Sequence, residues 1–161
     1  MRLLLVRHAQ TLWNVEHRVQ GHADIELDEH GLAQSALLEE AIAAEGADLV
    51  WTSDLKRSAA TATRIAARCG APLELDRALR ERCYGDWEGR LYTEVREELA
   101  SLVPATSYEE VLPPAGESYQ MVWDRLEPVA SRLRQLDGTA VVVTHGGTCA
   151  LLLARLLDAG I

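Results

Sequence analysis

Residues 1–14 read MRLLLVRHAQTLWN, an apolar run that stops at an arginine and a histidine. The run Leu3–Val6 is continuous and apolar, which is typical of a strand covered on both faces of a sheet. Arg7 and His8 are poorly suited to a core, so their place directly after such a strand needs another reason. Ligands of parallel sheets bind at the carboxyl ends of the strands. We therefore expect Arg7 and His8 to belong to a binding site.

The rest of the chain alternates between strand and helix patterns. Further strands are predicted at 48–52, 72–76 and 139–144, of which TAVVVT (139–144) has the strongest pattern. Helices are predicted from Asp28 to Gly46, over 54–68 with Gly70 as the stop, over 92–102, over 122–136 with a kink at Pro128, and after Gly147. This alternation predicts one α/β domain over residues 1–161, with helices on both faces of a largely parallel sheet.

Polar residues suited to an anionic ligand follow three of the predicted strands. In chain order they are Arg7, His8, Ser53, Arg57 and His145. The planar fork of an arginine matches phosphate oxygens in pairs, and a neutral imidazole can attack phosphorus as a covalent nucleophile. We interpret this edge of the sheet as a site for a phosphoryl group.

A glycine pair follows His145 and opens the last predicted helix. Gly146 and Gly147 would present backbone N–H groups and the positive end of the helix dipole. Both features suit an anion. We therefore expect this helix end to face the same ligand.

Composition excludes several classes of partner. The net charge is −9 with no basic run, which argues against nucleic acid or an anionic membrane surface. No apolar stretch approaches the ~20 residues that span a bilayer, and no signal peptide is recognisable, so we expect a cytoplasmic protein. The three cysteines form no C-x-x-C pair, which argues against a disulfide framework or a zinc site.

Six segments resemble the histidine phosphatase superfamily, also called phosphoglycerate mutase-like. VRHAQTLWN (6–14) is similar to the family's RHG-x-T-x-x-N signature. The other five segments follow in the family's order over nearly the whole chain: QGHADIELDEHG (20–31), TSDLKRSAATA (52–62), LRERCYGDWEG (79–89), PPAGES (113–118) and VTHGG (143–147). The resemblance implies the family's three-layer α/β/α fold.

The resemblance also implies a role for each matching residue. His8 would be the nucleophile that becomes phosphohistidine, and Glu81 would protonate the leaving oxygen and then activate water. The phosphoryl oxygens would be held by Arg7, Arg57 and His145, with further substrate or phosphate contacts from Asn14, Gln20, Gly21 and Gly146. No metal or other cofactor is implied, because the arginines take the charge-stabilising role of Mg²⁺.

The sequence is also compatible with purely structural roles for several of these side chains. Asn14 could cap a turn, and Arg57 could be a solvated ion-pairing residue on an alanine-rich helix. Glu88 lies near Glu81 in the same loop, and we expect a structural role for it. His17, His22 and His30 have the pattern of surface loop residues.

The chain departs from the family pattern in two places. Ala9 replaces the glycine of RHG, which would be strained if that position needed a positive φ. The family's sheet has strand order 3-2-4-1-5-6, and the four predicted strands account for 3-2-4-1 alone. Strand one would then be an uncovered apolar edge. We expect a homodimer through this edge, unless the natural protein continues beyond Ile161.

Three functions are compatible with this pattern. The first is a metal-independent phosphomonoesterase, of the histidine acid type, acting on a small phosphorylated metabolite. The second is a phosphoglycerate mutase, and the third is a phospholigand-binding protein without turnover. The short segment between Gly89 and Pro113 leaves little chain for a lid that excludes water, which favours hydrolysis. The presence of His8 and Glu81 disfavours the binding protein.

Overall fold

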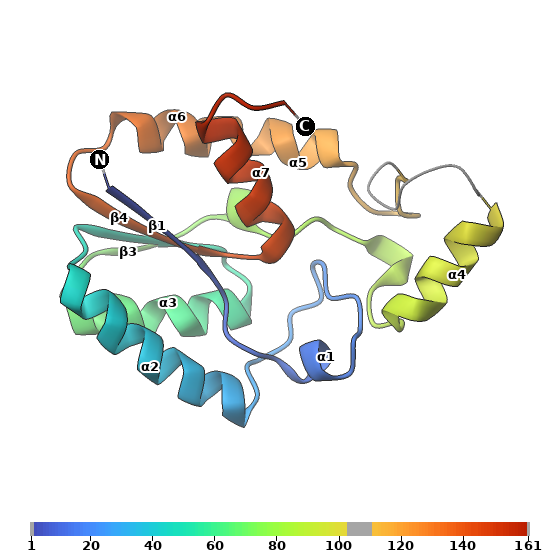
Figure 1. Ribbon diagram of the computed structural model, residues 1–161, viewed down its shortest axis with the longest axis horizontal. Coiled ribbons are helices and arrows are strands. Elements are labelled where there is room, and N and C mark those ends of the chain that lie inside the picture. The colour runs from blue at the N-terminus through green and yellow to red at the C-terminus, as the bar shows by residue number, and fades with distance from the viewer. Residues whose placement is uncertain (1, 103–110, 161) are drawn as a thin grey trace.

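A parallel sheet forms the middle layer of the molecule (Figure 1). In the computed structural model, which describes residues 2–102 and 111–160, the sheet has four strands in the order β1-β4-β2-β3. The strands are β1 (Arg2–Arg7), β2 (Leu49–Thr52), β3 (Leu73–Leu75) and β4 (Thr139–Thr144). All pairs are parallel. The predicted α/β class and the order 3-2-4-1 are confirmed.

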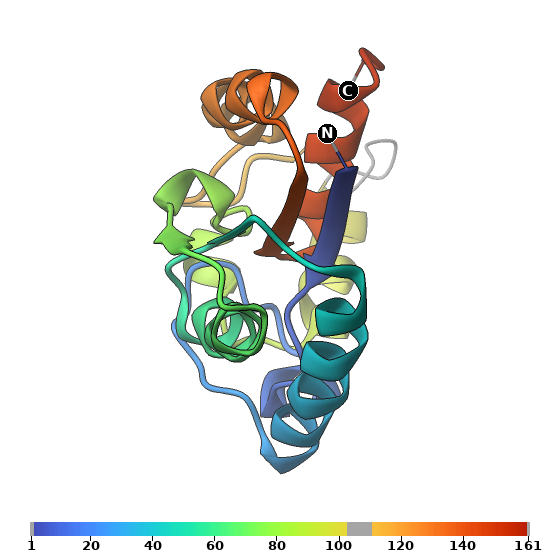
Figure 2. The same cartoon turned by 90° about the vertical axis from the view of Figure 1, so that its left-hand side faces the viewer.

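Helices cover both faces of this sheet, as Figures 1 and 2 show. One face packs on α2 (Glu29–Glu45) and α3 (Lys56–Cys69) through a core that includes Val50, Val141 and Val143. The other face packs on α5 (Tyr119–Arg125), α6 (Glu127–Gln135) and α7 (Gly146–Leu156) through Trp51, Ala140 and Val142. The side chains of a strand alternate between the faces, so the run 140–143 serves both cores.

Three predicted helix ends are confirmed by their caps. The Asp28 side chain accepts a hydrogen bond of 2.7 Å from the Gly31 N–H at the start of α2, and Gly46 ends that helix. Gly70 ends α3 in the left-handed conformation, with φ of 65°.

The helix predicted over 122–136 is two helices rather than one kinked helix. Leu126 is at once the last cap of α5 and the first cap of α6, and Pro128 lies at the start of α6. Proline has no N–H to continue the ladder of α5, and its ring is tolerated in the first turn of a new helix. The chain therefore restarts there.

Strand β1 has apolar cover on both faces, as its sequence predicted. It pairs with β4 and is the edge strand that the order 3-2-4-1 predicted, with Leu3, Leu4 and Leu5 half-buried. Leu4 and Val6 pack in the core on one face of the sheet. Leu3 and Leu5 pack against the core that lies under α5–α7.

The loops beyond the carboxyl ends of the strands carry a small core of their own. Helix α4 (Tyr92–Leu102) packs Val95 and Leu99 on Val19 and Trp87. The loop over residues 77–90 contains two short 3₁₀ turns, Arg77–Leu79 and Gly85–Trp87. Helix α1 covers Leu12–Val15. Residues 103–110, which belong to the segment predicted to be too short for a lid, lie outside the described residues.

Helices able to cross a bilayer are absent from residues 2–102 and 111–160, since none there is both long and apolar enough.

Candidate active site

The register of the sheet brings three strand ends together. Arg7 of β1 lies opposite Thr144 of β4, and the His8 N–H donates to the Thr144 carbonyl at 2.9 Å. On the other side of β4, the Ser53 N–H donates to the Val143 carbonyl at 3.1 Å. The residues that follow β1, β2 and β4 are therefore neighbours, as predicted from the topology.

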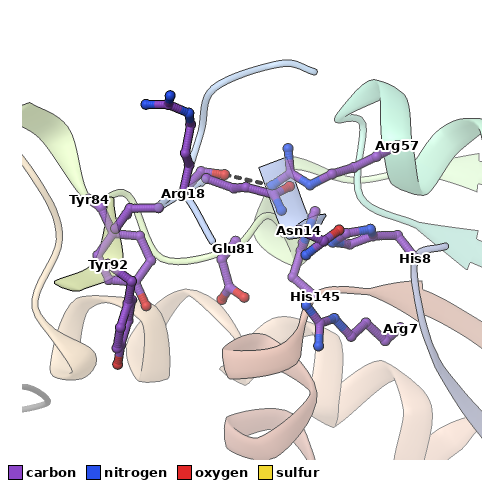
Figure 3. Close-up of a pocket in the computed structure, with 12 residues that line it drawn as sticks. Arg7, His8, Asn14, Arg18, Arg57, Glu81, Tyr84, Tyr92 and His145 are labelled. Atoms are coloured by element: carbon purple, nitrogen blue, oxygen red, sulfur yellow. Dashed lines mark hydrogen bonds between the residues drawn. The ribbon is translucent and has the colours of Figure 1, made fainter. Parts of the chain in front are cut away.

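A cavity of about 170 Å³ opens at these strand ends (Figure 3). Eight of the nine residues predicted for the site line it: Arg7, His8, Asn14, Gln20, Gly21, Arg57, Glu81 and His145. Gly146 is not among the lining residues.

His8 is held with one ring nitrogen available for reaction. Its Nδ1 lies 2.7 Å from the Ala9 carbonyl oxygen, which can only accept, so Nδ1 carries the hydrogen and Nε2 carries the lone pair. Burial, with the nearby Arg57 and Arg7, lowers the pKa of His8 to about 3. The ring is therefore neutral at neutral pH, which is the nucleophilic form.

Ala9 fits its position without strain. It lies outside the set of residues with positive φ, so the glycine of the family pattern is not needed for backbone freedom. Its N–H donates to Thr61 Oγ1 at 3.2 Å, and its side chain is buried.

Arg57 is a buried cation and not a solvated ion-pairing residue. Its side chain is inaccessible to solvent, and Nη1 and Nη2 donate to the carbonyls of Ala23 (2.7 Å) and Gly21 (2.8 Å). Burial lowers its pKa to about 10, which leaves it protonated at neutral pH. Its Nε–H is buried and has no partner within the described residues. A buried unpaired donor is costly, and a phosphoryl oxygen would satisfy it.

His145 stands beside His8, with ring centroids 5.1 Å apart. It is 1% exposed, and its Nε2 lies 2.9 Å from Ser53 Oγ. Its Nδ1 is buried without a partner in the described part of the chain. Burial, Arg57 and His8 lower the pKa of His145 well below its ordinary value, so the ring is neutral.

The Glu81 carboxylate binds the start of α7, where the sequence predicted a contact with the anionic substrate. Its carboxylate accepts hydrogen bonds from the N–H groups of Gly147 (3.0 Å), Thr148 (3.2 Å) and Arg82 (3.0 Å). The anion at the start of α7 is thus a protein side chain, and the expectation that Gly146 contacts the phosphate is unsupported. A Cβ at residue 147 would lie 2.8 Å from Glu81 Oε1, so glycine permits this approach.

Asn14 combines the two roles that the sequence left open. Its Oδ1 accepts from the Thr11 N–H at 3.0 Å within the cap of α1, and its side chain also lines the cavity. Gly21 contributes mainly through its carbonyl, which holds Arg57. Gln20 lines the cavity with a buried Oε1 that has no partner among the described residues.

The loop residues near Glu81 have structural contacts. Glu88 Oε1 accepts from the N–H groups of His22 (2.8 Å) and Tyr84 (2.9 Å), in accord with its expected structural role. His22 is half-buried, and its Nε2 lies 2.9 Å from the Glu81 carbonyl oxygen, so it is more than a surface loop residue. His30 lies in the first turn of α2 and is exposed.

Four residues of the cavity wall were not predicted: Arg18, Val19, Tyr84 and Tyr92. They come from loops and from the start of α4, where no periodic pattern indicates which way a side chain points. Arg18 pairs with Glu16 and donates to the Gly89 carbonyl at 2.8 Å. Arg18, Tyr84 and Tyr92 lie on the side of the cavity away from His8 and Arg57 (Figure 3).

The thiols and the potential metal ligands do not add to the site. Cys69, Cys83 and Cys149 are free, and burial raises the pKa of Cys149 to about 11. Within 2–102 and 111–160, no group of three or more His, Cys, Asp or Glu has an arrangement that could hold a metal ion.

The two buried histidines predict a loss of stability in mild acid. The unfolded chain binds protons below its ordinary histidine pKa of about 6.5, whereas the folded chain keeps His8 and His145 neutral. We expect the free energy of unfolding to fall between about pH 7 and about pH 5, by roughly 2 kcal/mol from His8, with a further fall in the same direction from His145.

Urea titrations across that range measure this effect, and His8→Ala should show a smaller fall than the wild type. Carboxylates with lowered pKa, such as Asp54 beside Arg80, affect stability only at lower pH. An unfolding free energy that stays constant across the range would contradict neutral, buried rings.

Comparison with known proteins agrees with this geometry. A family model described as histidine phosphatase superfamily (branch 1) matches residues 3–161. The chain is 38% identical to phosphoglycerate mutase-like protein 4 of Arabidopsis thaliana, over 95% of this chain and 70% of that protein. It is 32% identical to adenosylcobalamin/alpha-ribazole phosphatase of Escherichia coli K12, over 98% of this chain and 79% of that protein.

A solved structure shares the arrangement. Mycobacterial glucosyl-3-phosphoglycerate phosphatase in complex with VO3 superposes with a TM-score of 0.87 at 32% identity, covering 99% of this chain and 82% of that one. The fold, the motifs and the matched residues lead to one conclusion: the chain belongs to the histidine phosphatase superfamily, branch 1.

Proposed function

We propose that the protein hydrolyses small phosphomonoesters through a phosphohistidine formed on His8. The observation that carries this proposal is the set of nitrogens around one cavity. His8 Nε2 has a lone pair, while Arg57 Nε and His145 Nδ1 are buried without partners in the described structure. A phosphoryl group would place an electrophilic phosphorus and several acceptor oxygens among them.

The first step transfers the phosphoryl group to His8. Nε2 attacks phosphorus, the bond from phosphorus to the ester oxygen breaks, and that oxygen takes a proton from Glu81. Arg7 and Arg57 neutralise charge on the equatorial oxygens, which is the role that a metal ion has in other phosphoryl-transfer enzymes. Asn14 and Gln20 line the same cavity and would contact the phosphoryl oxygens.

The second step returns the enzyme to its starting state. The Glu81 carboxylate accepts a proton from water, whose oxygen attacks phosphorus, and the N–P bond breaks to release phosphate. Backbone N–H groups of α7 hold Glu81 in place through both steps. His8 regains its lone pair.

Small phosphorylated metabolites are the proposed substrate class. A cavity of about 170 Å³ admits a phosphoryl group with part of its leaving group. The named E. coli and mycobacterial relatives are phosphatases of such compounds, which supports hydrolysis over the mutase reaction.

The test is hydrolysis of p-nitrophenyl phosphate in EDTA, followed by a panel of phosphorylated metabolites. We expect turnover without added metal and a preferred substrate within the panel. Isomerisation of 3-phosphoglycerate without net release of phosphate would replace the proposal by the mutase. Phosphate binding with no turnover on any compound would replace it by the binding protein.

The homodimer through β1 and the cytoplasmic location stay predictions. Within the described residues β1 pairs with β4 alone, which leaves its other edge open, and the relatives give the dimer no support. Light scattering at micromolar concentration tests the dimer, and a monomeric mass would remove it.

A further inference from the structure

We propose that Ser53 is a positioning residue that fixes His145 as the tautomer with its hydrogen on Nδ1. Ser53 directly follows β2, and its side chain is completely buried. Its Oγ lies 2.9 Å from His145 Nε2, closer than the Ser58 Oγ at 3.5 Å. The inference rests on the proposed function, since it concerns how His145 meets the phosphoryl group.

The hydrogen of the Ser53 hydroxyl decides the tautomer. Ser53 Oγ accepts from the Leu55 N–H at 3.3 Å, so its lone pairs already have a donor. Among the described residues, the acceptor within reach of its hydrogen is His145 Nε2. A hydroxyl that donates to Nε2 requires a lone pair on that nitrogen, and a neutral imidazole then carries its hydrogen on Nδ1.

The opposite tautomer would leave one more buried group unsatisfied. With the hydrogen on Nε2, the Ser53 hydroxyl hydrogen would have no acceptor in the described structure. His145 Nδ1 has no partner among the described residues in either tautomer, so the Ser53 hydroxyl is the group that distinguishes the two.

The nearby Ser58 is placed less well for this role. Its Oγ lies 3.5 Å from His145 Nε2 and also 3.5 Å from the Thr144 carbonyl oxygen, which competes for its hydrogen. Ser58 stands where the family pattern has alanine. It therefore serves as a matched control: a second buried serine on the same nitrogen.

The chosen tautomer provides a donor in the cavity. Nδ1–H can donate to a phosphoryl oxygen, whereas a lone pair there would repel it. The hydrogen bond to Ser53 also sets the orientation of the ring, because it holds one of the two polar atoms of the imidazole. Ser53 thus acts on the substrate through His145 without touching it.

The tautomer can be read directly by NMR of protein labelled with ¹⁵N-histidine. We expect the wild-type His145 signal, assigned by its loss in His145→Gln, to show a protonated Nδ1 and an unprotonated Nε2. In Ser53→Ala the Nε2 signal should shift and the fraction of Nδ1–H should fall, whereas Ser58→Ala should keep the wild-type pattern. A wild-type ring with its hydrogen on Nε2 would overturn the proposal.

Kinetics of the same variants separate this role from a structural one. We expect Ser53→Ala to lose about 10- to 100-fold in kcat/KM and to bind inorganic phosphate more weakly. The kcat/KM of Ser58→Ala should stay within about 3-fold of the wild-type value, which is the variation expected for a substitution without a direct role. Equal losses in both variants would overturn the assignment to Ser53. Absence of turnover in the wild type would overturn the proposed function but leave the tautomer measurement valid.

Discussion

Replacing His8 by alanine is expected to abolish hydrolysis of every substrate, with a loss of about 10⁴-fold or more in kcat. The reason is that His8 Nε2 is the attacking atom. Its lone pair is made available by the hydrogen bond from Nδ1 to the Ala9 carbonyl and by a pKa of about 3. Steady-state release of phosphate from p-nitrophenyl phosphate in EDTA measures the effect.

The variant should keep its fold and its affinity for phosphate. Arg57 and His145 are untouched, so titration with inorganic phosphate should still give binding. His30→Ala is the matched control, since His30 is an exposed histidine on α2 and should retain full activity. Activity of His8→Ala near the wild-type level would mean that another group attacks phosphorus.

Replacing Glu81 by glutamine is expected to lower kcat by about 10²- to 10⁴-fold and to make the phosphoenzyme accumulate. Glutamine keeps the shape and one of the two acceptor oxygens, which can accept from the N–H of Gly147 or of Thr148, but it cannot exchange a proton. The nitrophenolate of p-nitrophenyl phosphate leaves without an acid, so the first step survives better than the second. Rapid-quench kinetics should show a burst of nitrophenol followed by slow turnover.

An ester with a poor leaving group should show a larger loss and no burst, because the first step then needs the acid. Glu29→Gln, an exposed change at the start of α2, is the control and should behave as wild type. A burst that is absent with both esters, together with normal turnover, would assign the proton transfers to a different residue.

The strand ends and helix caps were readable from the sequence because local chemistry determines them. TAVVVT forms β4 over the predicted residues, and Asp28 and Gly46 bound α2 as expected. The strand order followed from the family resemblance, and it places His8 and His145 side by side.

The remaining features depend on tertiary contacts that no local pattern encodes. The start of α7 attracts an anion, as predicted, but Glu81 reaches it from a loop that is distant in sequence. Tyr84 lines the cavity for the same reason: it lies in a loop, and loops have no periodicity that predicts the direction of a side chain.

The central claim is that His8 carries the phosphoryl group, and trapping the phosphoenzyme tests it most directly. Glu81→Gln, mixed with p-nitrophenyl phosphate and quenched in alkali, would be digested and its phosphopeptides mapped by mass spectrometry. The account predicts one phosphorylated residue, His8, in the peptide that contains the strand β1 end. A phosphoryl group on any other residue, or hydrolysis by the wild type with no phosphoenzyme trapped at any time, would contradict it.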